Sequence, residues 1–183
     1  AAALAAGSYA VDASELDPRS FRGLVLDNGL RVLLASDGLN APATHWCGVC
    51  SGVLMPVLEA MGERVRAAPR GDAKAIAERT ARLGVSCVAK AFLQYLPAML
   101  TAATPAQFAA AWTEVLDRNA EVLKHARSEE LREAVPEAVK NMLLVMSAQG
   151  VLAPGAPEGI WETTWKKAAA IDAGLTPAIV GAK

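Results

Sequence analysis

The four residues Thr104-Pro105-Ala106-Gln107 form the clearest helix start in this 183-residue chain. Threonine can accept a hydrogen bond from the backbone N–H three residues later, and proline is preorganised for the first helical position. Glutamine, three residues after the cap, can bond back to it. An apolar stripe at helical spacing then follows, made of Phe108, Trp112, Val115, Leu116, Val122 and Leu123. We therefore expect a helix that ends near His125 or Ala126.

The next segment has the same period and a similar start. Ser128 can cap a helix whose first turn carries Glu129 and Glu130, where the helix dipole favours negative charge. Gly150 is a natural C-terminal stop. Pro136 predicts a bend, or a helix that begins only after a short turn. The apolar stripe consists of Leu131, Val135, Ala138, Val139, Met142, Leu143 and Met146.

The upstream part of the chain also favours helices. Asp72 can cap a long segment in which Gly84 is a weak point and Pro97 a kink, and Thr44 can cap another segment that reaches Met61. The apolar positions of the long segment include Ile76, Leu83, Cys87, Val88, Phe92, Tyr95, Leu96 and Leu100. Residues 22–35 are a further expected helix, although Asp27-Asn28-Gly29 could instead turn a hairpin between two strands. We favour the helix, because a lone hairpin is only marginally stable.

These segments predict an all-α fold of antiparallel helical hairpins, stacked as a HEAT/armadillo-like α-solenoid. A compact bundle is the alternative, since no crisp repeat is visible. Residues 1–20 are expected to be a flexible N-terminal edge, 21–175 the helical repeat domain, and 176–183 a flexible C-terminal tail. A hydrophobic fraction of 53% with only 5% aromatic residues fits close-packed, alanine-rich helices.

Charge and composition exclude several functions. Eighteen basic and 19 acidic residues leave a net charge of −1, which gives no basic patch for nucleic acid. Two uncharged stretches, residues 38–58 and 91–113, are interrupted by proline and polar residues, so we interpret them as buried helix pairs rather than membrane spans. Three cysteines are an odd number and indicate a reducing compartment.

The candidate catalytic and metal sites are weak. Cys47 and Cys50 form a CxxC beside His45, but a redox role needs a thioredoxin-like context and zinc needs a second ligand pair. Cysteines at this spacing on a helix are more often small core residues. Zinc-hydrolase, nucleophile-elbow and nucleotide-binding motifs are missing from the sequence. We expect no enzyme activity, no metal and no cofactor.

Trp161 and Trp165 lie one helical turn apart and are followed by Lys166 and Lys167. Tryptophan beside lysine suits a membrane or partner contact. The alternative, which we prefer, is a terminal helix that docks both indoles onto the preceding hairpin, because buried aromatics supply large area in an aromatic-poor protein.

Several phrases resemble, in order, the C-terminal helical region of the large Golgi-type ARF guanine-nucleotide exchange factors, the Golgi-specific brefeldin A-resistance and GNOM type. They are VLMPVL at residues 53–58, AKAFLQYLPAML at 89–100, Phe108 with WTEVLD at 112–117, VPE and KNMLLVM between residues 135 and 146, and WETTW at 161–165.

In that family, exchange belongs to a Sec7 domain, and no Sec7 motif occurs here. The resemblance therefore implies a non-catalytic regulatory or targeting segment that acts in membrane recruitment and protein interaction in vesicle traffic. Its implied location is cytoplasmic and peripheral to the Golgi membrane. Its implied partners are the protein's own upstream domains or other subunits. The alternative is a stand-alone helical scaffold subunit of a larger complex.

Overall fold

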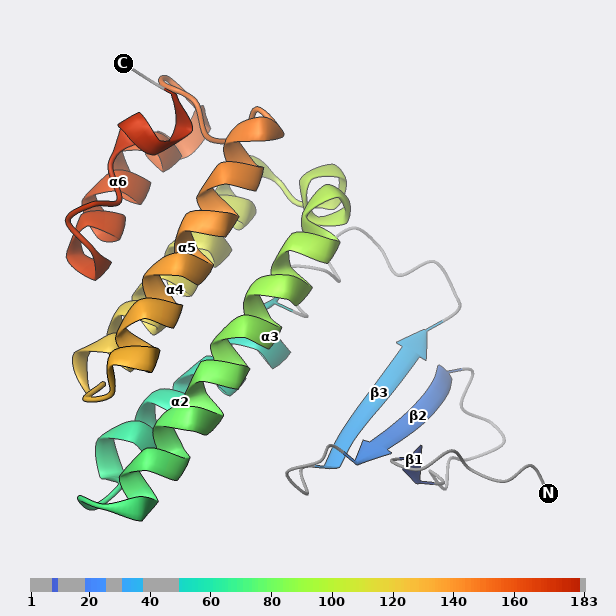
Figure 1. The fold of residues 1–183 in the computed structure, drawn as a ribbon. Coiled ribbons are helices and arrows are strands. Elements are labelled where there is room, and N and C mark those ends of the chain that lie inside the picture. The colour runs from blue at the N-terminus through green and yellow to red at the C-terminus, as the bar shows by residue number, and fades with distance from the viewer. Residues whose placement is uncertain (1–7, 10–18, 26–30, 38–49, 182–183) are drawn as a thin grey trace. The chain divides into compact units, whose positions relative to one another are not determined.

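The computed structural model describes residues 8–9, 19–25, 31–37 and 50–181. The chain divides into two compact units, Ala1–Pro42 and Ala43–Lys183, each described by itself (Figure 1). This division falls at residue 42, whereas the sequence analysis placed the start of the helical domain at residue 21.

The first unit contains a three-stranded antiparallel sheet in the order β1-β2-β3. Strand β1 is Ser8–Tyr9, β2 is Arg19–Val25 and β3 is Arg31–Asp37. Strands β2 and β3 pair in continuous register from Arg19↔Asp37 to Val25↔Arg31. The helix expected over residues 22–35 is therefore wrong, and the hairpin alternative holds. Gly23 would cost a helix about 1 kcal/mol, and pairing with β1 adds the third strand that a lone hairpin lacks.

The second unit is helical. The π-helical turn η1 (Cys50–Leu54) leads directly into α2 (Met55–Ala67). The helices α3 (Asp72–Ala102), α4 (Pro105–Lys124) and α5 (Glu129–Ala148) follow. The short η2 (Pro157–Gly159) precedes α6 (Ile160–Ile171), and η3 (Pro177–Val180) comes last. Helix α3 packs on α2 and α5, and α4 packs on α2 and α6. The prediction of packed helical hairpins is confirmed for this unit.

Two predicted helix starts are confirmed in detail. Thr104 Oγ1 accepts from the Gln107 backbone N–H at 3.2 Å, and the Thr104 N–H donates to Gln107 Oε1 at 3.0 Å. Ser128 caps α5 by accepting from Leu131 N–H. The predicted stop is also present, because Gly150 adopts φ +72°, in the left-handed region that glycine tolerates.

Other local predictions need correction. Gly71, at φ +96°, occupies the cap of α3, so Asp72 is the first helical residue. Helix α5 begins at Glu129 and continues through Pro136, so the later start after a turn does not occur. Helix α3 likewise runs through Pro97. Thr44, predicted to cap the helix before α3, lies outside the described residues.

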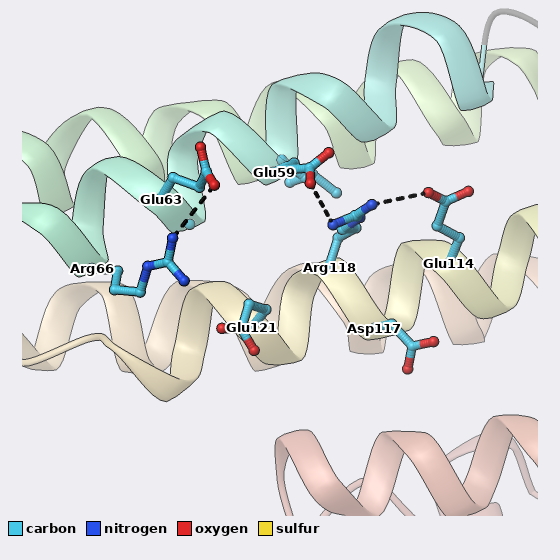
Figure 2. Close-up of a pocket in the computed structure, with 9 residues that line it drawn as sticks. Glu59, Glu63, Arg66, Glu114, Asp117, Arg118 and Glu121 are labelled. Carbon is cyan, nitrogen blue, oxygen red and sulfur yellow. Dashed lines mark hydrogen bonds and ion pairs between the residues drawn. The ribbon is translucent and has the colours of Figure 1, made fainter.

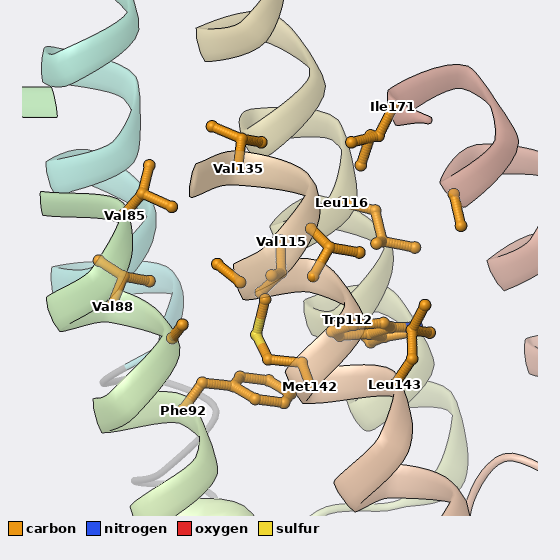
Figure 3. Close-up of a cluster of buried hydrophobic side chains, with 14 of the residues drawn as sticks. Val85, Val88, Phe92, Trp112, Val115, Leu116, Val135, Met142, Leu143 and Ile171 are labelled. Atoms are coloured by element: carbon orange, nitrogen blue, oxygen red, sulfur yellow. The ribbon is translucent and has the colours of Figure 1, made fainter. Parts of the chain in front are cut away.

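The core lies between the four long helices and α6 (Figure 3). Phe92 of α3 contacts Trp112 of α4 with ring centroids 5.4 Å apart. The same core cluster contains fully buried Leu and Met side chains: Met55, Leu58, Leu96, Met99, Leu116, Leu131, Met142, Leu143 and Met146. Burial of each such side chain contributes about 1.5–3 kcal/mol, which makes this cluster the main source of stability.

The C-terminal residues are partly ordered by packing. Helix η3 contacts α5, and Ile179 and Val180 pack against the core as half-buried side chains. The sequence analysis predicted a flexible tail from residue 176, whereas residues 177–180 form this short helix.

Candidate interaction surfaces

The four residues predicted as a partner or membrane contact all belong to α6, but their exposure differs. Trp165 is only 8% exposed and lies in the core. Trp161 is half-buried and meets Trp165 edge to face, with centroids 5.3 Å apart. Lys167 Nζ forms an ion pair with Asp117 Oδ1 of α4. Lys166 is the exposed member of the group.

Thr164, which sequence analysis did not single out, anchors the same helix. Its Oγ1 accepts a hydrogen bond of 2.8 Å from the indole Nε1–H of Trp112. Both side chains are buried, with 0% and 1% exposure. Buried polar groups need such partners. Thr164, the fourth residue of WETTW, therefore holds α6 against α4.

The KNMLLVM sequence in α5 divides between core and surface. Met142, Leu143 and Met146 are buried, whereas Lys140 is half-exposed and pairs with Glu137 at 3.7 Å. Leu144 and Val145 are 38% and 36% exposed. Three of its five apolar residues therefore pack the core, and the other two face solvent.

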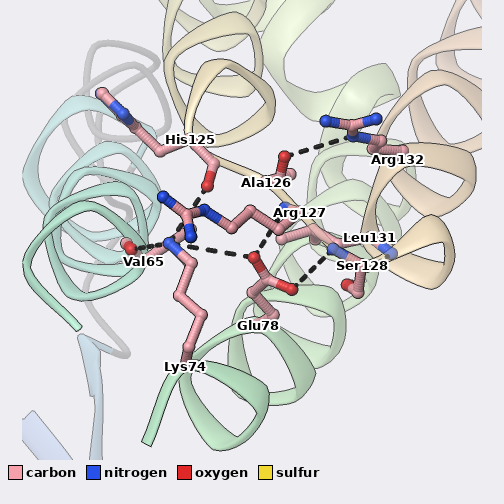
Figure 4. Close-up of polar contacts among 9 residues, drawn as sticks. All are labelled: Val65, Lys74, Glu78, His125, Ala126, Arg127, Ser128, Leu131 and Arg132. Carbon is pink, nitrogen blue, oxygen red and sulfur yellow. Dashed lines mark hydrogen bonds and ion pairs between the residues drawn. The ribbon is translucent and has the colours of Figure 1, made fainter. Parts of the chain in front are cut away.

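A buried polar clasp joins α3 to the α4–α5 loop (Figure 4). Glu78 is 4% exposed, and its two oxygens accept from the backbone N–H groups of Arg127 (2.7 Å) and Ser128 (2.8 Å). Lys74 Nζ lies 3.8 Å from Glu78 and also donates to the carbonyl oxygens of Val65 and His125. The clasp links the C-terminal ends of α2 and α4 to the N-terminal ends of α3 and α5.

The charge state of Glu78 follows from these contacts. Burial opposes its ionisation, but the hydrogen bonds from Ser128 and Arg127 and the nearby Lys74 ammonium outweigh burial. They hold the pKa of Glu78 below its ordinary value of 4.5. The ionised carboxylate is therefore the form that the folded protein stabilises.

A charged groove of about 450 Å³ lies between α2 and α4 (Figure 2). Leu58 and Gly62 form part of its lining. Arg118 bridges the two helices through Glu59 at 3.1 Å and Glu114 at 3.5 Å. The remaining charged lining residues are Glu63, Arg66, Asp117 and Glu121. Five carboxylates against two guanidinium groups leave the groove net negative, which suits basic rather than acidic partners.

One carboxylate of this groove also contacts the end of α4. Glu121 Oε1 lies 3.2 Å from His125 Nε2, and Glu121 Oε2 lies 3.5 Å from Lys124 Nζ. Partial burial raises the pKa of Glu121, but the contacts with His125 and Lys124 outweigh it and leave that pKa below 4.5. The packing of α2 on α4 brings these acidic residues together, and that packing cannot be read from the sequence of either helix alone.

A second groove, also about 450 Å³, is lined by apolar residues. It lies where the α3–α4 turn meets the loop between α5 and α6, and Leu100, Phe108 and Ile160 contribute its largest side chains. The Pro- and Gly-rich loop after α5 supplies much of its wall.

The structure tests only part of the cysteine prediction. Cys87, expected on the buried stripe of its helix, is exposed, so that expectation is wrong. Cys47 and His45 lie outside the described residues. Within the residues that the structure describes, no group of three or more His, Cys, Asp or Glu side chains could hold a metal ion.

One described helix, α3, is long and apolar enough to cross a membrane by length and composition alone. Only 33% of its most apolar window is buried inside the fold. Its inner residues, including Val85, Phe92 and Leu96, belong to the core.

Comparisons with known proteins place this helical unit in a family. A family model described as a GBF1-like tetratrico peptide repeat region matches residues 20–175. The chain is 32% identical over 158 residues to the ARF guanine-nucleotide exchange factor GNOM of Arabidopsis thaliana, a match covering 82% of this chain and 10% of GNOM. It is 30% identical over 142 residues to the ARF guanine-nucleotide exchange factor GNL1 of Arabidopsis thaliana, covering 74% of this chain and 10% of GNL1.

The chain thus spans about a tenth of the length of these curated relatives. No solved structure matches it. Tetratricopeptide repeats are helix–turn–helix units that stack, in agreement with the packed helical hairpins of α2 to α6. The resemblance drawn from the sequence is confirmed, and the chain belongs to the GBF1-like tetratrico peptide repeat region family.

Proposed function

We propose that this chain is a non-catalytic regulatory and targeting segment of an ARF guanine-nucleotide exchange factor. It acts in membrane recruitment and protein interaction in vesicle traffic. The observation that supports this most is the match over 82% of the chain to a tenth of GNOM, which is named as such a factor. In this proposal, nucleotide exchange belongs to a Sec7 domain elsewhere in the protein.

The proposed location is the cytoplasmic surface of the Golgi membrane. Helix α3 uses Phe92 and its other inner residues for the core, and leaving the fold would expose that core to water. We therefore place the segment on the membrane surface rather than across the bilayer. Trp161 and Lys166 of α6 keep exposed atoms and remain a proposed contact.

The proposed protein partners are other domains of the same protein or subunits of a complex. The groove between α2 and α4 offers net negative charge to a basic segment. The groove at Phe108 and Ile160 offers apolar surface to a hydrophobic side chain.

The test combines two assays on the purified 183-residue chain. Flotation with vesicles of Golgi-like composition should recover the chain with the lipid. Fluorescent-nucleotide release from an ARF GTPase should stay at the spontaneous rate. Exchange by the chain itself would refute a non-catalytic role. If the chain stays in solution and instead purifies in a stoichiometric complex lacking any ARF, the scaffold alternative replaces the proposal.

A further inference from the structure

Helix α3 carries large apolar side chains on its solvent side. Ile76 is 66% exposed and Leu83 is 50% exposed, and Cys87 is exposed as well. Spacings of seven and four residues place these three within an arc of about 40° at 100° per residue. They form one stripe, opposite the residues that α3 contributes to the core. We call this stripe, together with Arg79 and Lys90, the α3 outer face.

Asp72, the first residue of α3, is exposed on the same side of the helix as Ile76, and beyond it the charges on the α3 outer face have one sign. Arg79 and Lys90 are both exposed and lie eleven residues apart, so they occupy the same flank of the stripe. Within the described part of the chain, neither forms an ion pair. The only acidic residue from 73 to 102 is Glu78, which is buried in the clasp with both oxygens bonded. Toward solvent, this stretch of helix therefore presents apolar and positive groups together.

This combination matches the chemistry of an anionic lipid surface. Interfacial helices place apolar side chains at the headgroup boundary and hold basic side chains against negative headgroups. A helix partner would instead seat in a groove, and neither groove described above is lined by Ile76, Leu83 or Lys90. The α6 contact is a weaker candidate, because Trp165 is buried and Lys167 is already paired.

We propose that the α3 outer face lies on an anionic membrane, with Ile76 and Leu83 at the headgroup boundary and Arg79 and Lys90 against the lipid phosphates and carboxylates. This inference rests on the membrane recruitment proposed above and assigns it to a surface. The core-facing side of α3 stays in the fold, so the protein binds peripherally.

The experiment is flotation of the full 183-residue chain with vesicles of phosphatidylcholine, with or without phosphatidylserine. Wild type should float only with the anionic vesicles. The charge variant R79Q/K90Q should bind about 25-fold more weakly, at about fivefold for each basic residue, and added salt should weaken wild-type binding. The apolar variant I76Q/L83Q should lose at least about tenfold from the smaller apolar area in the interface.

Matched controls use the same substitutions elsewhere on the surface. Variant R64Q/R127Q removes two exposed charges that lie outside both α3 and the proposed α6 contact. Variant L144Q/V145Q replaces two apolar side chains of α5 that are 38% and 36% exposed. Both should bind within about twofold of wild type, which is less than the loss of even one interfacial charge. Helical circular dichroism verifies that every variant is folded.

The outcomes separate the two proposals. If wild type floats and both α3 variants float equally well, the α3 assignment is wrong while membrane recruitment stands. If wild type ignores both kinds of vesicle, both proposals fail. If K166Q loses binding and R79Q/K90Q does not, α6 is the membrane contact. If the α3 variants lose a protein partner but no lipid affinity, the face is a protein interface and the inference is overturned.

Discussion

Replacement of Thr164 by valine tests whether the WETTW sequence is structural. Valine keeps the shape of threonine but removes the hydroxyl, so the Trp112 indole N–H loses the acceptor now 2.8 Å away. Trp112 is 1% exposed, and water cannot take over the bond without opening the core. A buried donor left unsatisfied costs about 1–3 kcal/mol. We expect Thr164→Val to lower the free energy of unfolding by about 2 kcal/mol.

The assay is urea unfolding followed by circular dichroism at the helical band, which reports the helical unit. Thr101→Val is the matched control, because Thr101 is exposed and its hydroxyl bonds only to the Pro97 carbonyl of its own helix. The control should stay within about 0.5 kcal/mol of wild type. A change in transition midpoint without a change in slope would identify a loss of stability alone.

A double-mutant cycle isolates the bond itself. In a Trp112→Phe background there is no indole N–H to leave unpaired, so Thr164→Val should cost about 1 kcal/mol less than in wild type. Equal costs in the two backgrounds, or a Thr164→Val cost no greater than that of Thr101→Val, would refute the assignment of a structural role to this pair.

The remaining predictions concern other local interactions that stabilise the helical unit. Glu78→Gln should destabilise by about 2 kcal/mol near neutral pH, because it replaces a charged acceptor of two backbone N–H groups. Since the pKa of Glu78 is lowered on folding, its contribution is present above pH 4.5 and is lost as pH falls through the folded pKa. Urea titrations should therefore show wild type and variant converging in acid, and a constant difference would contradict the clasp. Gly62→Ala should stabilise α2 by up to about 1 kcal/mol, because the added Cβ meets Val122 Cγ2 at an ordinary 3.6 Å; a lower melting temperature would show that this contact is too tight. Thr104→Ala should cost about 1 kcal/mol through loss of the capping box, and an unchanged melting temperature would show that the cap is dispensable.

The features that could be predicted from sequence are local ones. The capping box at Thr104, the Ser128 cap and the Gly150 stop each depend on residues within one turn. The core positions of α4 and α5 follow from their 3.6-residue period. The family resemblance was also readable, because the KNMLLVM and WETTW sequences, which contribute Met142 and Trp165 to this core, resemble phrases of that family.

The features that failed depend on pairing between distant segments. Residues 19–25 and 31–37 form antiparallel strands because β2 pairs with both β1 and β3, and propensity alone could not weigh those contacts. The apolar period of α3 continues around to its solvent side, so Ile76, Leu83 and Cys87 resembled core residues although they are exposed. The role of Glu78 could not be recognised from the sequence, because its two partners lie about fifty residues away.

The central claim is that this segment directs an exchange factor to membranes without performing exchange. The most direct measurement compares the full-length gene product with a version lacking residues 50–181, in both ARF nucleotide exchange in solution and recovery with Golgi membranes. The account predicts an unchanged exchange rate in solution and a large loss of membrane-bound protein. Loss of exchange in solution, with membrane recovery intact, would contradict it.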